Sequence, residues 1–431
     1  MKTVDISNFS KYLEDETDFI IDEFLNKYII NIRKIEEEEI EEIKHLFTSI
    51  IEAICKSDFE VSIEVCKKLI DYNINLSIPY VMLTHELINL KRLIMERLLY
   101  KDAKDEIYHL YNLNMLFEDM IANVYLDKYI KDLQKRNSFR ISSLNDIYEK
   151  NIIIYYKAHL EWLNDLTKSI ERRDNRFFPE INHNLCTFGK WLSESGKKII
   201  QNNSKYKNIS KLHENLHYLA DRIKSYLLRA EQNHHILLTY LERCEMLSLS
   251  LGTEIALIDN TLINSEASKD PLTGALNRQK LNQLYFNQLE IAFATSETFV
   301  LAMCDLDNFK KINDNYGHVA GDEVLKNFVK ISKKILRSSD MLIRYGGEEF
   351  IFILPAIKLE KAKIILNEIK DKFASFVLDF EDNKISTTLS FGTIELNPEA
   401  DESYLKNFEG VVSLVDKKLY EAKNSGKNRV C

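Results

Sequence analysis

The sequence predicts a multidomain protein in which all-α domains precede an α/β domain, and three observations support this. The chain has 431 residues, which is enough for roughly three domains. It contains only 11 glycines and 5 prolines, whereas β-sandwiches and barrels need many turns built from these residues. Eight of the 11 glycines follow residue 270. We therefore expect long helices before residue 270 and a different architecture after it.

Charge and composition exclude several classes of protein. The formal net charge of -9 provides no basic surface for nucleic acid or an anionic membrane. No run approaches the ~20 apolar residues of a membrane helix, and the start, MKTVDISNFSKYLEDE, lacks the basic end and apolar core of a signal peptide. The six cysteines have no framework spacing, which favours buried thiols or metal ligands over disulfides. We expect a cytoplasmic protein without membrane insertion and without a nucleic-acid partner.

Residues 1–145 are predicted to form a helical sensory domain. Apolar side chains recur there at steps of 4, 3 and 4 residues, which places them on one helical face: Ile43, Phe47, Ile50 and Ile54. This stretch shows no catalytic constellation. It faintly resembles globin-like sensor domains, and the lack of a histidine close before Ile78-Pro79 indicates a non-haem version.

Residues 146–230 are predicted to form a second helical bundle with a metal site. His213 and His217 are four residues apart, a spacing that directs both imidazoles to one helical face. His159 and Cys186 precede them at intervals of 27 residues, long enough for helix–loop–helix returns. A thiolate with three imidazoles forms a closed tetrahedral zinc set. His183 is a rival ligand.

The alternative interpretation of this bundle is a dimerisation scaffold with structural histidines and Cys186 as a small core residue. However, the segment Cys-Thr-Phe-Gly-Lys-Trp at 186–191, with its flanking histidines, resembles the Cys-x-Phe-Gly-x-Trp motif of the chemoreceptor zinc-binding (CZB) domain. The resemblance implies that Zn²⁺ bound to His159, Cys186, His213 and His217 regulates the attached domain.

Residues 231–267 are predicted to form a connector helix. Apolar residues fit alternating steps of 4 and 3, interrupted once by Ser248, and they form a seam suited to a parallel two-stranded coiled coil: Leu237, Leu241, Cys244, Leu251, Ile255, Ile258 and Leu262. The alternative is an amphipathic helix packed on its own domain.

Residues 268–431 alternate between predicted strands and helices. The apolar run 299–304 indicates a buried central strand, and short strands are expected at 341–344, 350–354 and 385–391. Helices are expected at 321–338, 359–376 and 411–423. This order predicts an α/β sheet covered by helices.

Acidic residues gather at two places in this predicted sheet. Asp305 ends the central strand, and Glu348 and Glu349 follow a Gly-Gly turn. If the two strands are neighbours, the three carboxylates converge, and such a cluster suits Mg²⁺ together with substrate phosphates. Lys423 and Lys427 could pair with those phosphates. The alternative is a tight turn with solvated acids.

Successive motifs in this region resemble those of the GGDEF family. They are DPLTGALNR (270–278), DLDNFKKIN (305–313), GHVAGD (317–322) and RYGGEEF (344–350), followed by SFG (390–392) and AKNSGKN (422–428). The resemblance implies a diguanylate cyclase, which condenses two GTP into cyclic di-GMP with release of two pyrophosphates. Because each domain carries one GTP, it also implies a homodimer.

The resemblance further implies the roles of individual residues. Mg²⁺ or Mn²⁺ would be held by Asp305, Leu306, Glu348 and Glu349, and Glu348 would also help to activate the attacking ribose hydroxyl. Guanine would be bound by Asn313 and Asp322, and phosphates by Lys310, Lys423 and Lys427. Arg337 and Asp340 form an RxxD pattern that resembles the family's product-inhibition site. The alternative function is a non-catalytic receptor for cyclic di-GMP or GTP on a helical dimerisation scaffold.

Overall fold

The computed structural model describes residues 8–29, 37–145, 152–229, 233–266, 269–400 and 402–431. It divides into two compact units, residues 1–132 with 223–242 and residues 133–222 with 243–431. The long helices α7 (Lys104–Asn145), α11 (Asn203–Leu227) and α12 (His234–Glu266) each contribute residues to both units. The predicted domain boundaries near 145, 230 and 267 adjoin residues outside this description, and they stay predictions.

The described residues of the first unit form helices and loops. Besides the first part of α7, the end of α11 and the start of α12, its helices are α1 (Ser10–Leu13), α2 (Thr17–Phe24), α4 (Glu37–Cys55), α5 (Phe59–Asn75) and α6 (Tyr80–Tyr100), with the short helices η1 (Glu14–Glu16) and η2 (Leu25–Ile29). The predicted apolar face of α4 is buried at Ile43, Phe47, Ile50 and Ile54. This confirms the helical period for that segment. Kinship with globin-like sensors stays a prediction.

The second unit begins with a helical bundle. It contains α8 (Ile153–Arg172), η3 (Asn175–Phe177), α9 (Thr187–Trp191), η4 (Leu192–Gly196), α10 (Lys197–Ile199) and α11 (Asn203–Leu227), together with most of α12. Leu251, Ile255 and Ile258 of α12 pack in one core with Tyr156 and Leu160 of α8. These seam residues are at most 6% exposed within a single chain. The structure therefore agrees with the alternative of a helix packed on its own domain, because buried residues cannot also line a two-stranded coiled coil.

One segment of the described residues, His234–Asn264 of α12, is long and apolar enough to span a membrane by length and composition. The apolar runs of the sequence predicted no such segment. Two of its acidic residues have partners inside the protein: Glu245 pairs with Arg136 at 2.7 Å and Arg140 at 3.0 Å, and Asp259 accepts a hydrogen bond from Ile152 N at 2.7 Å. The hydrophobicity of α12 is thus used for packing in the bundle.

The rest of the second unit is a mixed sheet in the order β1-β3-β4-β2-β7. Its strands are β1 (Leu276–Asn277), β2 (Phe299–Leu306), β3 (Met341–Arg344), β4 (Glu349–Leu354) and β7 (Leu389–Leu396). The pair β1–β3 is parallel, and the other pairs are antiparallel. A separate hairpin joins β5 (Leu378–Phe380) and β6 (Asn383–Ile385). Helices before a mixed α/β domain confirm the predicted fold class.

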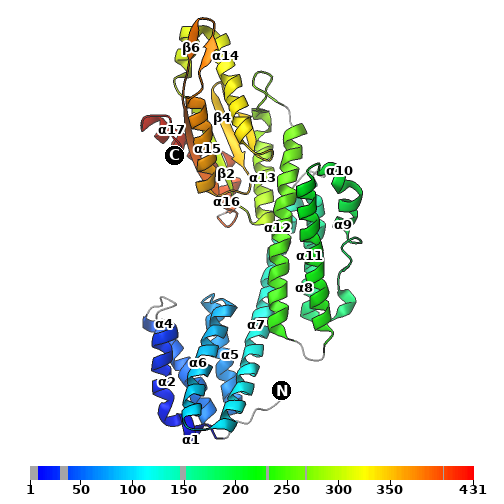
Figure 1. Cartoon of the computed structure of the whole chain (residues 1–431), viewed down its shortest axis with the longest axis vertical. Helices are drawn as coiled ribbons and strands as arrows, with labels where there is room; N and C mark the ends of the chain where they lie inside the picture. The colour runs from blue at the N-terminus through cyan, green and yellow to red at the C-terminus, as the bar shows by residue number, and fades with distance from the viewer. Residues whose placement is uncertain (1–7, 30–36, 146–151, 230–232, 267–268, 401) are drawn as a thin grey trace. The chain divides into compact units, whose positions relative to one another are not determined.

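Helices cover both faces of this sheet (Figure 1). Even-numbered residues of β2, such as Ala302, pack with α14 (Phe309–Ile335) and α15 (Leu359–Ala374). Odd-numbered ones, such as Met303, pack with α13 (Leu281–Thr295) and α17 (Phe408–Asn424). Because side chains alternate along a strand, Asp305 lies on the face of α17. The remaining elements are η5 (Arg278–Lys280) and α16 (Glu402–Lys406).

Two elements differ from the sequence prediction. Helix α14 begins at Phe309 rather than near 321, and it is broken at Gly317, whose φ of 83° lies outside the helical region. The strand predicted at 385–391 is split: β6 ends at Ile385 and β7 begins at Leu389. Gly317 and Gly321 favoured a loop before residue 321, whereas the β-branched residues Thr387 and Thr388 fit a continuous strand. Tertiary packing decides where a helix or a strand begins.

Candidate active site and candidate metal centre

The three acidic residues predicted to converge do meet at one edge of the sheet. Strands β2 and β4 pair antiparallel, and their register places Asp305 directly opposite Glu349. Leu306 N donates to Glu348 O at 3.3 Å, while the turn is closed by Tyr345 N donating to Glu349 O at 2.8 Å. The Gly-Gly turn thus brings Glu348 beside the end of β2.

Electrostatics at this edge suit a cation. Asp305 is buried, and burial is the main cause that raises its pKa, with Asp307 adding to the effect and Lys423 opposing it. The pKa of Glu348 is also raised, first by burial and then by the charge of Asp305. Lys423 Nζ lies 2.8 Å from Asp305 Oδ2. A divalent ion would relieve this repulsion, and the carboxylates with the Leu306 carbonyl are hard oxygen donors of the kind Mg²⁺ prefers.

Residues predicted to bind nucleotide lie on α14, in the last turn of α17 and just after α17. The break at Gly317 folds the helix so that Asn313 Oδ1 rests against Gly321, where a Cβ atom would overlap it. Asn313 and Asp322, which follows Gly321, are both partly buried near this break. Lys310 is exposed. Lys427 Nζ donates to Asn308 Oδ1 at 2.6 Å, so the end of the chain meets the start of α14.

A second cluster of potential ligands lies inside the helical bundle. Imidazole nitrogens of His159, His213 and His217 lie within 4.8 Å of one another, and all three residues are buried. Cys186 Sγ lies 3.2 Å from His213 Nε2. The four residues come from α8, the N-cap of α9 and α11. His183, the rival ligand, is not part of the three-histidine group, although its ring centroid is 6.1 Å from that of His213.

The donor atoms of this cluster fit a metal ion. Both ring nitrogens of His159 and Nε2 of His217 are buried without a hydrogen-bond partner, which is costly in a protein interior. Burial lowers the pKa of His159 to about 3, His213 to about 2 and His217 to about 4. Neutral imidazoles are the form that binds metal. His217 Nδ1 lies 2.8 Å from Ile181 O, which orients the ring so that Nε2 faces its neighbours.

The short motif around Cys186 fixes the position of its thiol. Cys186 caps α9, and Gly189 N donates to Sγ at 3.2 Å. A Cβ atom at residue 189 would overlap the His183 carbonyl and come within 3.2 Å of the His213 ring. The sequence spacing Cys-x-x-Gly therefore has a packing reason.

Two protein-family models match the segments of the chain that contain the two sites. Residues 267–429 match the model described as diguanylate cyclase, GGDEF domain, and residues 159–224 match the chemoreceptor zinc-binding domain. The chain contains a CZB domain followed by a GGDEF domain. The GGDEF match contains the acidic edge, and the CZB match contains the cluster of three histidines and Cys186.

Several curated proteins are similar to this chain. Diguanylate cyclase DgcP of Pseudomonas aeruginosa is 36% identical over 165 residues, which are 38% of this chain and 24% of the relative. Diguanylate cyclase DgcZ of Escherichia coli K12 is 27% identical over 276 residues, covering 63% of this chain and 89% of the relative. A crystal structure of the GGDEF domain of DgcB from Caulobacter crescentus with c-di-GMP shares 29% identity, covering 38% of this chain and 90% of that one, with a TM-score of 0.35. The chain spans less than half the length of the first three curated relatives it matches.

Two supporting features of the GGDEF domain were present in the motifs, but the sequence did not reveal their contacts. Asp307 is buried and accepts hydrogen bonds from Thr388 Oγ1 at 2.6 Å and Ser390 Oγ at 2.8 Å. It therefore ties the end of β2 to β7. Arg344 pairs with Asp270 at 3.1 Å and donates to Gly347 O at 2.9 Å, so the DPLTG segment braces the acidic turn.

The RxxD turn of the GGDEF domain contacts the end of α12. Arg337 N donates to Asp340 Oδ2 at 2.8 Å, and burial raises the pKa of Asp340 to about 6. Asn264 Nδ2 donates to Ser338 O at 2.9 Å and to Asp340 O at 3.0 Å. These residues line a cavity of about 490 Å³ that also includes Lys333. The connector helix thus forms part of the wall beside the predicted product site.

Proposed function

We propose that the protein is a Mg²⁺-dependent diguanylate cyclase that condenses two GTP into cyclic di-GMP and two pyrophosphates as a homodimer. The observation that carries the proposal is the register that sets Asp305 opposite Glu349, with Glu348 beside them in an intact GGEEF turn. The GGDEF family match and the names of the curated relatives support it.

The acidic edge would hold the metal through Asp305, Glu348, Glu349 and the carbonyl of Leu306. When bound, the ion would neutralise charge on the triphosphate and on the attacking oxygen. In each half-reaction the ribose 3′-oxygen of one GTP forms a bond to the α-phosphorus of the other, and pyrophosphate leaves. Glu348, whose pKa is raised by burial and by Asp305, is suited to accept the hydroxyl proton.

The surrounding residues would orient the nucleotide. The Asp322 carboxylate can accept hydrogen bonds from the ring N–H and amino group of guanine, which adenine does not present together, and Asn313 would hold the same edge. Lys310, Lys423 and Lys427 would contact phosphates. Lys423 already lies 2.8 Å from Asp305, so it would bridge the acidic edge and the substrate. Because the α12 seam is buried within one chain, the dimer would form through other surfaces.

We further propose two regulatory sites and a cytoplasmic location. His159, Cys186, His213 and His217 would hold Zn²⁺ in a closed site, which controls conformation and has no open position for catalysis. Arg337 and Asp340 would bind the product and limit its accumulation. A cytoplasmic location gives the cyclase access to GTP.

The decisive experiment is turnover of the purified full-length chain with GTP and Mg²⁺. We expect stoichiometric formation of one cyclic di-GMP and two pyrophosphates, measured by chromatography and a phosphate-coupled assay. The alternative function, a non-catalytic receptor, predicts binding of cyclic di-GMP or GTP without product. A folded, GTP-saturated dimer that forms no product would overturn the proposal in favour of that receptor.

A further inference from the structure

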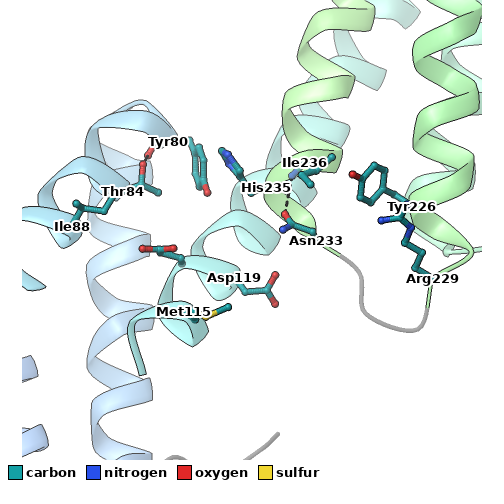
Figure 2. Close-up of a pocket in the computed structure, with 11 residues that line it drawn as sticks. Tyr80, Thr84, Ile88, Met115, Asp119, Tyr226, Arg229, Asn233, His235 and Ile236 are labelled. Carbon is teal, nitrogen blue, oxygen red and sulfur yellow. Dashed lines mark hydrogen bonds between the residues drawn. The ribbon is translucent and has the colours of Figure 1, made fainter. Parts of the chain in front are cut away.

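A cavity of about 580 Å³ lies within the first compact unit, and its lining includes none of the residues assigned above. Its walls come from α6, α7, the end of α11 and the start of α12 (Figure 2). This volume falls within the range of about 300–1,000 Å³ that is usual for small-molecule sites. The unit that the sequence analysis left without a chemical role therefore contains a site large enough for an organic ligand.

Aromatic rings form part of the cavity wall. The rings of Tyr80 and His235 lie side by side with centroids 5.4 Å apart (Figure 2). Tyr226 lines another part of the wall, and the guanidinium of Arg229 lies 4.4 Å from its ring centroid. The faces of such rings carry partial negative charge and attract cations.

Two consecutive carboxylates of α7, Glu118 and Asp119, also line the cavity. Asp119 Oδ1 lies 2.8 Å from His234 Nδ1, which ties α7 to the first turn of α12. The pKa of Tyr80 is raised to about 12, chiefly by burial and further by the negative charges of Glu118, Asp119 and Glu242. With two carboxylates and one guanidinium, the lining of the cavity carries more acidic than basic side chains.

We propose that this cavity binds a small organic cation, namely an amine attached to an aromatic body. The ammonium group would lie between the Glu118 carboxylate and the ring of Tyr80, because charge-assisted hydrogen bonds and cation–π attraction both favour a cation there. The apolar body would pack against Ile88 and Met115, which line the same cavity. An organic anion of the same shape would be repelled by both carboxylates.

Such a ligand would be a signal for the rest of the chain. It would contact α7, α11 and α12, three helices with residues in both units. A ligand that prefers one arrangement of these helices shifts the equilibrium between arrangements, and the coupling is reciprocal by thermodynamic necessity. This consequence rests on the proposed cyclase function, whereas the binding site itself does not.

The test is calorimetric titration of the full-length chain with three probes of one shape: 2-phenylethylamine, 2-phenylethanol and phenylacetate. We expect the amine to bind at least about tenfold more tightly than the alcohol, and phenylacetate to bind more weakly still. Equal affinity for amine and alcohol, tighter binding of phenylacetate, or no binding of the amine at millimolar concentration would each overturn the proposal. Cyclase turnover plays no part in this measurement, so its failure is distinguishable from failure of the proposed function.

Variants locate the binding site. Glu118→Gln is expected to weaken amine binding about fivefold, whereas Asp127→Asn, on an exposed position two turns further along α7, should leave it unchanged. Tyr80→Leu should weaken binding about fivefold and Tyr80→Phe much less, because the ring face rather than the hydroxyl attracts the cation. Circular dichroism establishes that each variant is folded. Equal loss in Glu118→Gln and Asp127→Asn, or in both Tyr80 variants, would contradict the assignment.

Discussion

The acidic edge of the GGDEF domain and the histidine cluster of the CZB domain are both suited to a metal ion, but they are built in opposite ways. At the edge, Glu348 and Glu349 are only partly buried, and Lys423 balances part of their charge together with that of Asp305. In the cluster, the three histidines are buried, burial lowers the pKa of each, and His159 and His217 have unpartnered nitrogens. An open, charged site can admit a phosphorylated substrate, whereas a closed, neutral one can only hold its ion. Exposure and charge therefore distinguish the proposed catalytic metal site from the proposed regulatory one.

The largest effect is expected at the edge. Glu348→Gln keeps the shape of the side chain but removes the carboxylate that holds metal and accepts the proton, so cyclic di-GMP formation should fall by about 10²–10⁴-fold. Rates of product formation at saturating GTP measure this. Asp379→Asn, on the exposed face of β5, is the matched control and should retain full turnover. Similar losses of turnover in both variants would show that turnover does not depend specifically on the Glu348 carboxylate.

The zinc content of the purified protein tests whether the histidine cluster binds a metal ion. Native protein should contain about one zinc per chain by elemental analysis, and His213→Gln should lose most of it, because a closed site needs all four ligands. His183→Gln is the matched control, since His183 lies outside the group of three histidines. Zinc retained in His213→Gln but lost in His183→Gln would show that His183, and not His213, is the zinc ligand.

A third prediction concerns the effect of the buried Asp259 carboxyl on the stability of the bundle. Asp259 is buried, its Oδ2 has no partner, and burial raises its pKa from 3.8 to about 7. The folded state therefore retains a proton that the unfolded state releases, so this group's stabilisation is complete below pH 3.8 and is lost as the pH rises through 7. Asp259→Asn stays neutral, and it should be more stable than the native chain by about 1–2 kcal/mol at pH 8.

Calorimetric melting at pH 5 and pH 8 measures this difference. The gain in Asp259→Asn should be small at pH 5 and larger at pH 8, whereas Asp165→Asn, on the exposed side of α8, should behave like the native chain at both. A gain that does not depend on pH would mean that charge is not the cause.

The smallest effect is expected where the two regions meet. Asn264→Ala removes two hydrogen bonds from the end of α12 to the RxxD turn, each with a net value of about 1 kcal/mol. If that turn binds the product, inhibition by cyclic di-GMP should weaken by roughly threefold to tenfold, with the initial rate unchanged. Inhibition curves with added product measure this. Thr239→Ala, on the exposed part of α12, serves as the control. Equal inhibition of the native chain, Asn264→Ala and Thr239→Ala would show that α12 does not contribute to product inhibition.

Motifs predicted which residues gather at each site better than they predicted what supports those residues. The convergence of Asp305 with the Gly-Gly turn was predicted on the condition that the two strands are neighbours, and their register meets that condition. The proximity of His213 and Cys186 was predicted from spacing and a short motif. The buried supports were not predicted: Asp307 with Ser390, and Arg344 with Asp270, are separated by 83 and 74 residues. Contacts over such separations depend on strand order and register, which local periodicity does not specify.

The order of helical and α/β regions could be predicted from the amino-acid sequence alone, and the sequence also provided the candidate ligands of both sites. Few glycines and prolines favour helices, and acids or imidazoles at fixed spacing indicate ligands for a cation. Tertiary structure decided which surfaces remain available. The heptad pattern of α12 fits a partner chain or its own bundle equally well, because both bury the same apolar stripe. Packing against α8 resolves that ambiguity. In the same arrangement, Asn264 at the end of α12 donates a hydrogen bond to Ser338 of the RxxD turn.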